Sequence, residues 1–200
     1  MKRVLVACEF SGVVRRAFRR HGHDAWSCDL RRAEDLSPYH YVADAVDVVE
    51  GVDWDLLIAH PPCTRLCNSG VRWLHSPPKG RTTAQMYADL VQGAKLFSAM
   101  WNADVPQIAV ENPVMHRHAK RLIDNYQAPA QSVQPWQFGH GETKRTCFWL
   151  RGLPPLQPTN IVEGREHRIH RMAPGPDREK ERSRTFEGIA EAMAVQWGNA

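Results

Sequence analysis

The chain has 200 residues, of which 42% are hydrophobic and 24% charged, and its formal net charge is +4 at pH 7. These values suit one domain, or one domain with a small appendage, and exclude a chain that is disordered throughout. The mild excess of positive charge permits a phosphate-bearing partner without requiring one. No apolar run reaches membrane-spanning length and the five cysteines form no Cys-x-x-Cys pair, so we expect a cytoplasmic protein with free thiols and no membrane partner.

Strand-like apolar runs alternate with helical patterns up to Leu150. This alternation predicts an α/β fold built from βαβ units, with a mainly parallel sheet, a C-terminal hairpin and flanking helices. The expected strands cover residues 4–8, 24–28, 41–43, 54–59 and 107–110, and the expected hairpin covers residues 132–137 and 146–150. The expected helices cover residues 11–21, 83–101, 115–126 and 188–197, and residues 64–82 are expected to form a loop.

The character of the sequence changes after Leu150, where prolines and arginines accumulate. Arg165, Arg168 and Arg171 begin a run of basic residues, and we expect these side chains to contact phosphates. Acidic residues in the same run leave a solvated, self-paired segment as the alternative. We therefore expect a main domain at 1–150, a short basic segment at 151–187 that contacts the substrate, and a C-terminal helix at 188–200 that packs back on the main domain.

Two polar triplets follow buried strands of the expected sheet. Pro61-Pro62-Cys63 comes after the apolar run 56–59, and Glu111-Asn112-Pro113 comes after the run 108–110. Parallel strands bring their carboxyl ends together in the crevice where open α/β sheets bind ligands. A thiolate can add to an electron-poor ring, and a nearby carboxylic acid can protonate that ring as charge develops. The pair of triplets therefore points to covalent chemistry on a pyrimidine, against the alternatives of a buried structural cysteine and a solvated Asn-Pro turn.

Three further polar positions follow the early strands. Phe10-Ser11-Gly12 forms the first strand-to-helix turn, where the backbone can approach a ligand closely. Asp29 ends the second strand, where an acid can reach a ribose hydroxyl, and Asp44 after the third strand could accept from an exocyclic amine. Together they predict a pocket for a nucleoside cofactor, although a tight turn, a helix cap and solvated turns are the alternatives.

Basic residues precede the second strand of the hairpin. Lys144 and Arg145 could lower the pKa of the Cys63 thiol or bind a phosphate, and we group them with the catalytic residues. Alternatively, Lys144 and Arg145 are exposed basic side chains of the hairpin without a catalytic role. Cys67 lies close to Cys63, but the spacing of the two cysteines suits neither a metal pair nor a redox pair, and no metal is expected.

In this order, these residues resemble the cytosine-C5 DNA methyltransferase family. The turn 10–12 is similar to its cofactor loop, Asp29 and Asp44 to its ribose and adenine contacts, the triplet 61–63 to its nucleophile motif, and the triplet 111–113 to its ring-nitrogen motif. Glu142-Thr143-Lys144 stands where the family has a Gln and an Arg, and Gly188-Ile189-Ala190 resembles its final motif. The resemblance implies a Rossmann-like class I methyltransferase fold, S-adenosylmethionine as methyl donor and a flipped-out cytosine as substrate.

The resemblance also implies a role for each matched residue. Cys63 would add to C6 of the cytosine, Glu111 would hold N3 and the exocyclic amine, and Asn112 would contact the substrate. Pro61 would join the cofactor pocket with Phe10 and its neighbours. The family inserts a large target-recognition domain where this chain has only residues 151–187, so the substrate, for which DNA is favoured, could instead be RNA or a free nucleotide.

Other functions compete with methyl transfer. A catalytically silent nucleic-acid-binding module is one, although Cys63 and Glu111 are both present. A thiol hydrolase that pairs Cys63 with His60, His75 or His140 is another, but no sequence feature orients such a histidine. The oligomeric state stays open.

Overall fold

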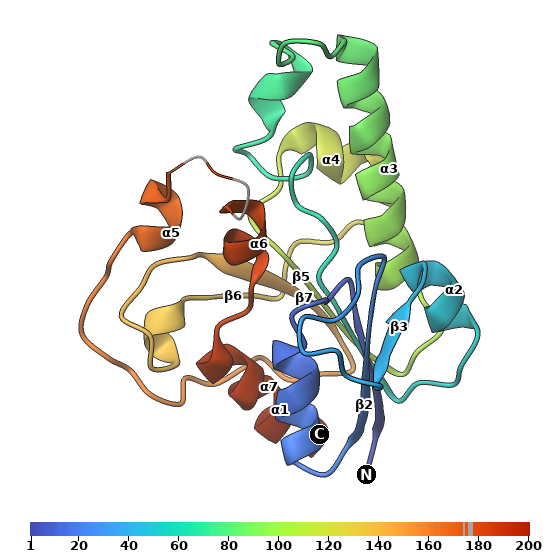
Figure 1. Cartoon of the computed structure of the whole chain (residues 1–200), viewed down its shortest axis with the longest axis vertical. Helices are drawn as coiled ribbons and strands as arrows, with labels where there is room; N and C mark the ends of the chain where they lie inside the picture. Colours follow the sequence, from blue (N-terminus) through green and yellow to red (C-terminus); the bar gives the residue numbers. More distant parts are fainter. Residues whose placement is uncertain (174, 176–177) are drawn as a thin grey trace.

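A seven-stranded sheet runs through the molecule in the order β3-β2-β1-β4-β5-β7-β6 (Figure 1). The computed structural model describes residues 1–173, 175 and 178–200. Its strands are β1 (Arg3–Ala7), β2 (Asp24–Asp29), β3 (His40–Val42), β4 (Leu56–Ala59), β5 (Gln107–Asn112), β6 (Gln131–Val133) and β7 (Thr146–Arg151). Its α-helices are α1 (Val13–Arg20), α2 (Ala45–Glu50), α3 (Thr83–Trp101), α4 (Arg117–Leu122), α5 (Arg168–Arg171), α6 (Arg178–Ser183) and α7 (Glu187–Gly198), and 3-10 helices lie at Val71–Leu74 and Pro135–Gln137. Within these described residues, no helix has both the length and the apolar character that a membrane crossing requires.

The strand directions define the class of the sheet. β1 pairs in parallel with β2 and β4, β2 with β3, and β4 with β5. β7 runs antiparallel to both β5 and β6, and β6 and β7 form the C-terminal hairpin. The predicted α/β fold with a mainly parallel sheet is confirmed, and this strand order with its reversed β7 is the Rossmann-like class I methyltransferase topology.

Two apolar layers cover the two faces of the sheet. Leu57 and Ala59 of β4 pack into one layer with α2, α3 and α4, whereas Leu56 and Ile58 pack into the other with α1 and α7. All four side chains are fully buried, which is why β4 reads as an unbroken apolar run rather than an alternating one. Trp197 of α7 is also fully buried, and α7 packs along α1.

Several element boundaries differ from the sequence prediction. Helix α2 was not expected; it begins because the Asp44 side chain caps it by accepting from the amide of Val46 at 2.9 Å. The helix expected over 115–126 spans only α4, since the backbone becomes extended at Ile123, whose side chain is buried. The strand expected over 132–137 stops at β6, because Pro135 lacks an amide proton and starts a 3-10 helix.

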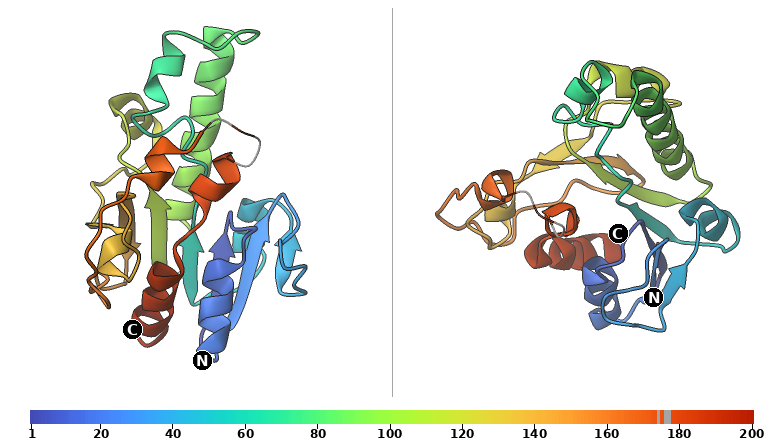
Figure 2. Two further views of the ribbon diagram at one scale, coloured as in Figure 1. Left: turned by 60° about the vertical axis from the view of Figure 1, so that its left-hand side comes forward. Right: turned by 45° about the horizontal axis from the view of Figure 1, so that its top comes forward.

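The basic segment 151–187 holds more helix than the sequence predicts. Helices α5 and α6 both lie in it, and residues 174, 176 and 177 between them are outside the described part of the chain. Figure 2 shows that α6 lies over the carboxyl ends of the central strands, above α7 and across from α3. This placement brings basic side chains to the edge of the sheet where the two polar triplets end.

Candidate active site

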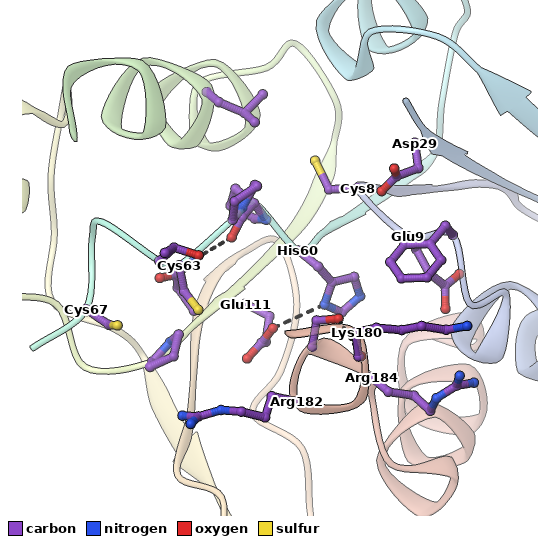
Figure 3. Close-up of a pocket in the computed structure, with 18 of the residues that line it drawn as sticks. Cys8, Glu9, Asp29, His60, Cys63, Cys67, Glu111, Lys180, Arg182 and Arg184 are labelled. Atoms are coloured by element: carbon purple, nitrogen blue, oxygen red, sulfur yellow. Dashed lines mark hydrogen bonds and ion pairs between the residues drawn. The ribbon is translucent and has the colours of Figure 1, made fainter. Parts of the chain in front are cut away.

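A cavity of about 1540 Å³ opens at the carboxyl ends of the central strands, and α6 lies across it (Figure 3). This volume exceeds the roughly 300–1,000 Å³ typical of a site for one small molecule. It therefore has room for a nucleoside cofactor beside a second ligand. Of the residues selected from the sequence, those that line it are Phe10, Ser11, Asp29, Asp44, Pro61, Cys63, Glu111, Asn112, Lys144 and Arg145.

The loop that carries Cys63 is fastened to the loop that follows Glu111. The amide of Asn68 donates to the carbonyl of Val114 at 3.1 Å, and the amide of His116 donates to the carbonyl of Leu66 at 3.0 Å. These backbone bonds tie the segment after β4 to the segment after β5. The two triplets are thus held at a fixed separation, which a nucleophile and its partner acid require.

The Asn112 side chain supports the Pro-Pro-Cys turn through a hydrogen bond. Its side chain is fully buried, and its Nδ2 atom donates to the carbonyl of Pro61 at 2.8 Å. Its Oδ1 atom is buried and has no hydrogen-bond partner among the described residues. The structure gives the amide of Asn112 a supporting role for the loop that presents Cys63. Contact of Asn112 with a substrate stays a prediction.

The Cys63 thiol is half-buried and shares its environment with a second thiol. A hydrogen bond with Cys67 and burial raise the pKa of Cys63, and the nearby Glu111 raises it further, whereas Lys144 lowers it. The same bond lowers the pKa of Cys67 to about 5, with help from the Ser69 hydroxyl at 3.0 Å from its sulfur. The interaction between the two thiols therefore favours the negative charge on Cys67 over Cys63. Lys144 acts on Cys63 in the predicted direction, but it does not by itself make Cys63 a thiolate.

Glu111 is paired with a histidine that the sequence analysis did not assign to it. His60 lies directly after β4, and its Nδ1 atom lies 3.3 Å from Oε2 of Glu111 (Figure 3). Burial raises the pKa of Glu111, but the bond from His60 and the charge of Lys144 outweigh it, so the pKa lies below its ordinary value of 4.5. Glu111 is therefore ionised at neutral pH. The pairing follows from the strand register, since Ala59 of β4 lies opposite Val110 of β5.

The opposite side of the cavity offers contacts that suit a nucleoside. Asp29 and Asp44 accept backbone amides through Oδ1, from Arg31 and Val46 respectively, and no bond is recorded for either Oδ2 atom among the described residues. The Phe10 ring and the 76% exposed Leu30 add apolar surface. Ribose hydroxyls and an adenine amine donate hydrogen bonds to carboxylate acceptors, and an adenine ring packs on apolar surface, so these residues fit S-adenosylmethionine.

Gly12 does not line the cavity. It is buried, adopts a left-handed φ of 68°, and lies against the Arg15 guanidinium, which a side chain at this position would meet. Glycine is therefore required here to start α1. The turn 10–12 reaches the cavity through Phe10 and Ser11 instead.

The basic segment reaches the cavity with residues other than those singled out. Arg165 stacks over Trp136 at 3.9 Å, Arg168 pairs with Glu142 at 2.8 Å, and Arg171 is exposed on α5; none of these three arginines lines the cavity. The basic residues of the segment that line it come from α6 and its end: Arg178, Lys180, Arg182 and Arg184. Contact of the first three arginines with a phosphate stays a prediction.

Ion pairs fasten α6 over the cavity. Lys180 and Arg184 each approach the Glu34 carboxylate at 2.8 Å, and Lys144 Nζ donates to the carbonyl of Arg184 at 3.2 Å. Burial raises the pKa of Glu34, but the bonds from its two cationic partners outweigh it and hold the pKa below its ordinary value of 4.5. No ion pair is recorded for Arg182 among the described residues, and Arg182 lines the same cavity as Glu111.

The remaining histidines do not complete a thiol hydrolase. His140 accepts from the amide of Gly188 at 3.0 Å, and the His75 ring lies 6.2 Å from that of His118. In the part of the chain that the structure describes, no hydrogen bond joins any histidine to Cys63, and no group of three His, Cys, Asp or Glu side chains could hold a metal.

Comparisons with known proteins do not assign this chain to a family. No family model and no curated protein matches the chain. Among solved structures, a protein described as a DNA modification methyltransferase encoded within a prophage (E. coli) matches 80% of this chain and 51% of its own, with 16% identity and a TM-score of 0.49. The Entamoeba histolytica methyltransferase EhMeth matches 82% of this chain and 56% of its own, with 13% identity and a TM-score of 0.48. The chain thus spans about half the length of the structures it resembles.

Proposed function

We propose that this chain is an S-adenosylmethionine-dependent methyltransferase that acts on C5 of cytosine in DNA. The observation that carries the proposal is one cavity that holds Cys63 and Glu111 after β4 and β5 on one side and Asp29 and Asp44 after β2 and β3 on the other. A thiol beside a carboxyl group suits covalent addition to a pyrimidine, and two carboxylates at strand ends suit a nucleoside cofactor. The class I methyltransferase order of the sheet supports the same conclusion.

The chemistry assigns a task to each side chain. The Cys63 thiol loses its proton and its sulfur forms a bond to C6, which places electron density on C5 and N3. Glu111 holds N3 and the exocyclic amine, so it stabilises the charge where it develops. S-adenosylmethionine, when bound, supplies the methyl group that C5 attacks. A base then removes the C5 proton, the C5–C6 double bond re-forms and the Cys63 thiolate leaves.

A nucleic-acid substrate is supported by the basic side chains on α6. Lys180, Arg182 and Arg184 line the cavity beside the reacting groups, and phosphate contacts of this type position a strand without reading its bases. The segment 151–187 is too short for an extensive base-reading surface. We therefore expect loose sequence preference and steep weakening of binding with salt.

The test is covalent trapping on oligonucleotides that contain 5-fluorocytosine, because fluorine at C5 cannot leave as a proton does and the adduct persists. The wild type with S-adenosylmethionine should form an adduct that survives denaturing electrophoresis. Cys63→Ser should form none while still binding the cofactor, and Cys28→Ser, a buried cysteine outside the cavity lining, should behave as the wild type.

Two outcomes would change the assignment. Trapping that persists in Cys63→Ser and disappears in Cys67→Ser would make Cys67 the nucleophile. Trapping on 5-fluorocytosine RNA or on the free nucleotide, with none on DNA, would transfer the same chemistry to another substrate.

A further inference from the structure

His60 lines the cavity and carries a buried ring nitrogen that has no partner among the described residues. Its side chain is 9% exposed, and Nδ1 lies 3.3 Å from Oε2 of Glu111. Its other ring nitrogen, Nε2, is buried and has no hydrogen-bond partner among the described residues. A buried polar atom without a partner is costly, and in a cavity it marks a position where a bound molecule or a water completes the bond.

Glu111 needs a proton that it does not hold. In the proposed reaction N3 of the cytosine gains a proton as Cys63 adds to C6, and only a neutral carboxylic acid can donate one. The low pKa of Glu111 leaves it ionised before the reaction starts. The His60 side chain is the sole hydrogen-bond partner recorded for the Glu111 side chain among the described residues.

We propose that His60 is a positioning residue that relays a proton to Glu111, taking it up at Nε2 from the cavity and releasing it from Nδ1. The inference rests on the proposed function. An imidazole suits this relay because its two nitrogens can take up and release a proton in one step. The residue lies beside the nucleophile motif in the sequence, and the register of β4 and β5 aligns it with Glu111.

The step balances. The Cys63 S–H bond breaks, an S–C6 bond forms, and the thiol proton enters the cavity. A proton enters His60 at Nε2, the Nδ1 proton moves to Glu111, and Glu111 gives its proton to N3. When the thiolate leaves at the end of the reaction, the N3 proton returns along the same path and every residue regains its starting state.

Charged groups from several elements surround the pair. Glu111 comes from the end of β5, Lys144 from the loop before β7, Cys63 from the loop after β4, Lys180, Arg182 and Arg184 from α6 and its end, and Glu9 and Asp29 from the ends of β1 and β2. Among these groups, the charge of Lys144 favours an ionised Glu111. Protonation of Glu111 therefore requires a nearby donor, and His60 is the group in contact with it.

The first experiment does not depend on activity. Carbon-13 NMR of protein labelled at glutamate carboxyls, with Glu111 identified by Glu111→Gln, follows the titration of Glu111. His60→Ala should move the midpoint upward, because the bond that lowers the pKa is gone. His21→Ala is the matched control: it removes the histidine from an exposed pair with Glu191 and should leave the Glu111 midpoint unchanged.

The second experiment tests whether His60 passes a proton to Glu111 or only holds the Glu111 side chain in place. His60→Asn keeps a donor near the position of Nδ1 but cannot pass a proton, so its rate of adduct formation on 5-fluorocytosine DNA should fall about 100-fold, as for His60→Ala. Added imidazole should restore His60→Ala, which leaves space for it, and should not restore His60→Asn. KM for the DNA should stay unchanged in both variants.

The outcomes are distinct. Full activity in His60→Asn, or an unchanged Glu111 midpoint in His60→Ala, would overturn the relay while leaving the proposed function intact. Failure of imidazole to restore His60→Ala would also overturn it. A wild type that forms no adduct with 5-fluorocytosine in DNA, RNA or free nucleotide would count against the proposed function itself, and with it the relay.

Discussion

Removal of the buried Asn112 amide should destabilise the protein and slow its chemistry together. Asn112→Ala breaks the 2.8 Å bond to the carbonyl of Pro61 and leaves that acceptor without its partner. A buried polar group left unsatisfied costs about 1–3 kcal/mol, so we expect the free energy of unfolding to fall by that amount. Because the same bond fixes the turn that presents Cys63, its loss should also lower the population of the reactive geometry. Each 1.4 kcal/mol of that loss corresponds to about a tenfold slower reaction, which gives a slowing of roughly 5- to 150-fold.

Urea denaturation and the rate of adduct formation on 5-fluorocytosine DNA measure the two effects. Asn199→Ala is the control, since it removes an exposed amide that donates to the carbonyl of Val195 at 2.9 Å, far from the cavity. That control should change the unfolding free energy by no more than about 0.5 kcal/mol and should leave the rate unchanged. Equal stability of the two variants would refute the energetic reasoning. A destabilised Asn112→Ala with an undiminished rate would refute the link between this amide and the placement of Cys63.

Three further predictions follow from the cavity and the helix over it. Arg182→Gln should weaken DNA binding and reduce the salt slope by about 1, whereas Arg20→Gln, whose parent side chain pairs with Glu191 and does not line the cavity, should do neither; equal losses in fluorescence anisotropy would refute this assignment. Because the pKa of Glu34 is depressed, its stabilisation of α6 is present above its ordinary value of 4.5 and is lost as pH falls through the lower, folded-state pKa. Hydrogen exchange in residues 178–183, corrected for intrinsic rates, should then rise on acidification, and it should be insensitive to pH in Glu34→Gln. Asp29→Ala should weaken S-adenosylmethionine binding by about 1–3 kcal/mol in calorimetry if it loses a buried hydrogen bond, and unchanged affinity would remove Asp29 from the cofactor site.

The sequence predicts well those parts of the fold that depend on neighbouring residues in the chain. The apolar run 56–59 predicts a strand that is covered on both faces, and each of its residues is fully buried in the structure. The helix α3 begins and ends where its pattern predicts, since Thr82 and Gln85 form a capping box at its start. The polar triplets after β4 and β5 reach one cavity because the carboxyl ends of neighbouring parallel strands share an edge of the sheet.

The parts that the sequence does not predict depend on contacts between distant segments. The bond between His60 and Glu111 requires the register of β4 against β5, which neither strand's own pattern specifies. The position of α6 depends on the ion pairs that Lys180 and Arg184 form with Glu34, which lies far away in the sequence. Composition alone therefore marked the segment 151–187 as basic, but it could not tell Arg182, which lines the cavity, from Arg168, which does not.

Lys144 connects the basic helix to the reacting groups. Its Nζ atom donates to the carbonyl of Arg184 at the end of α6, and its charge lowers the pKa of both Cys63 and Glu111. Arg184 in turn reaches Glu34, which lies in the loop that follows Asp29 at the cofactor side of the cavity. Helix α6, which we propose holds a substrate phosphate, is thus joined on one side to the proposed reacting groups and on the other to the loop beside the proposed cofactor site. A displacement of α6 would alter the charge around Cys63 and the shape of the cofactor side together. We therefore infer that α6 is an element through which phosphate binding can be coupled to both.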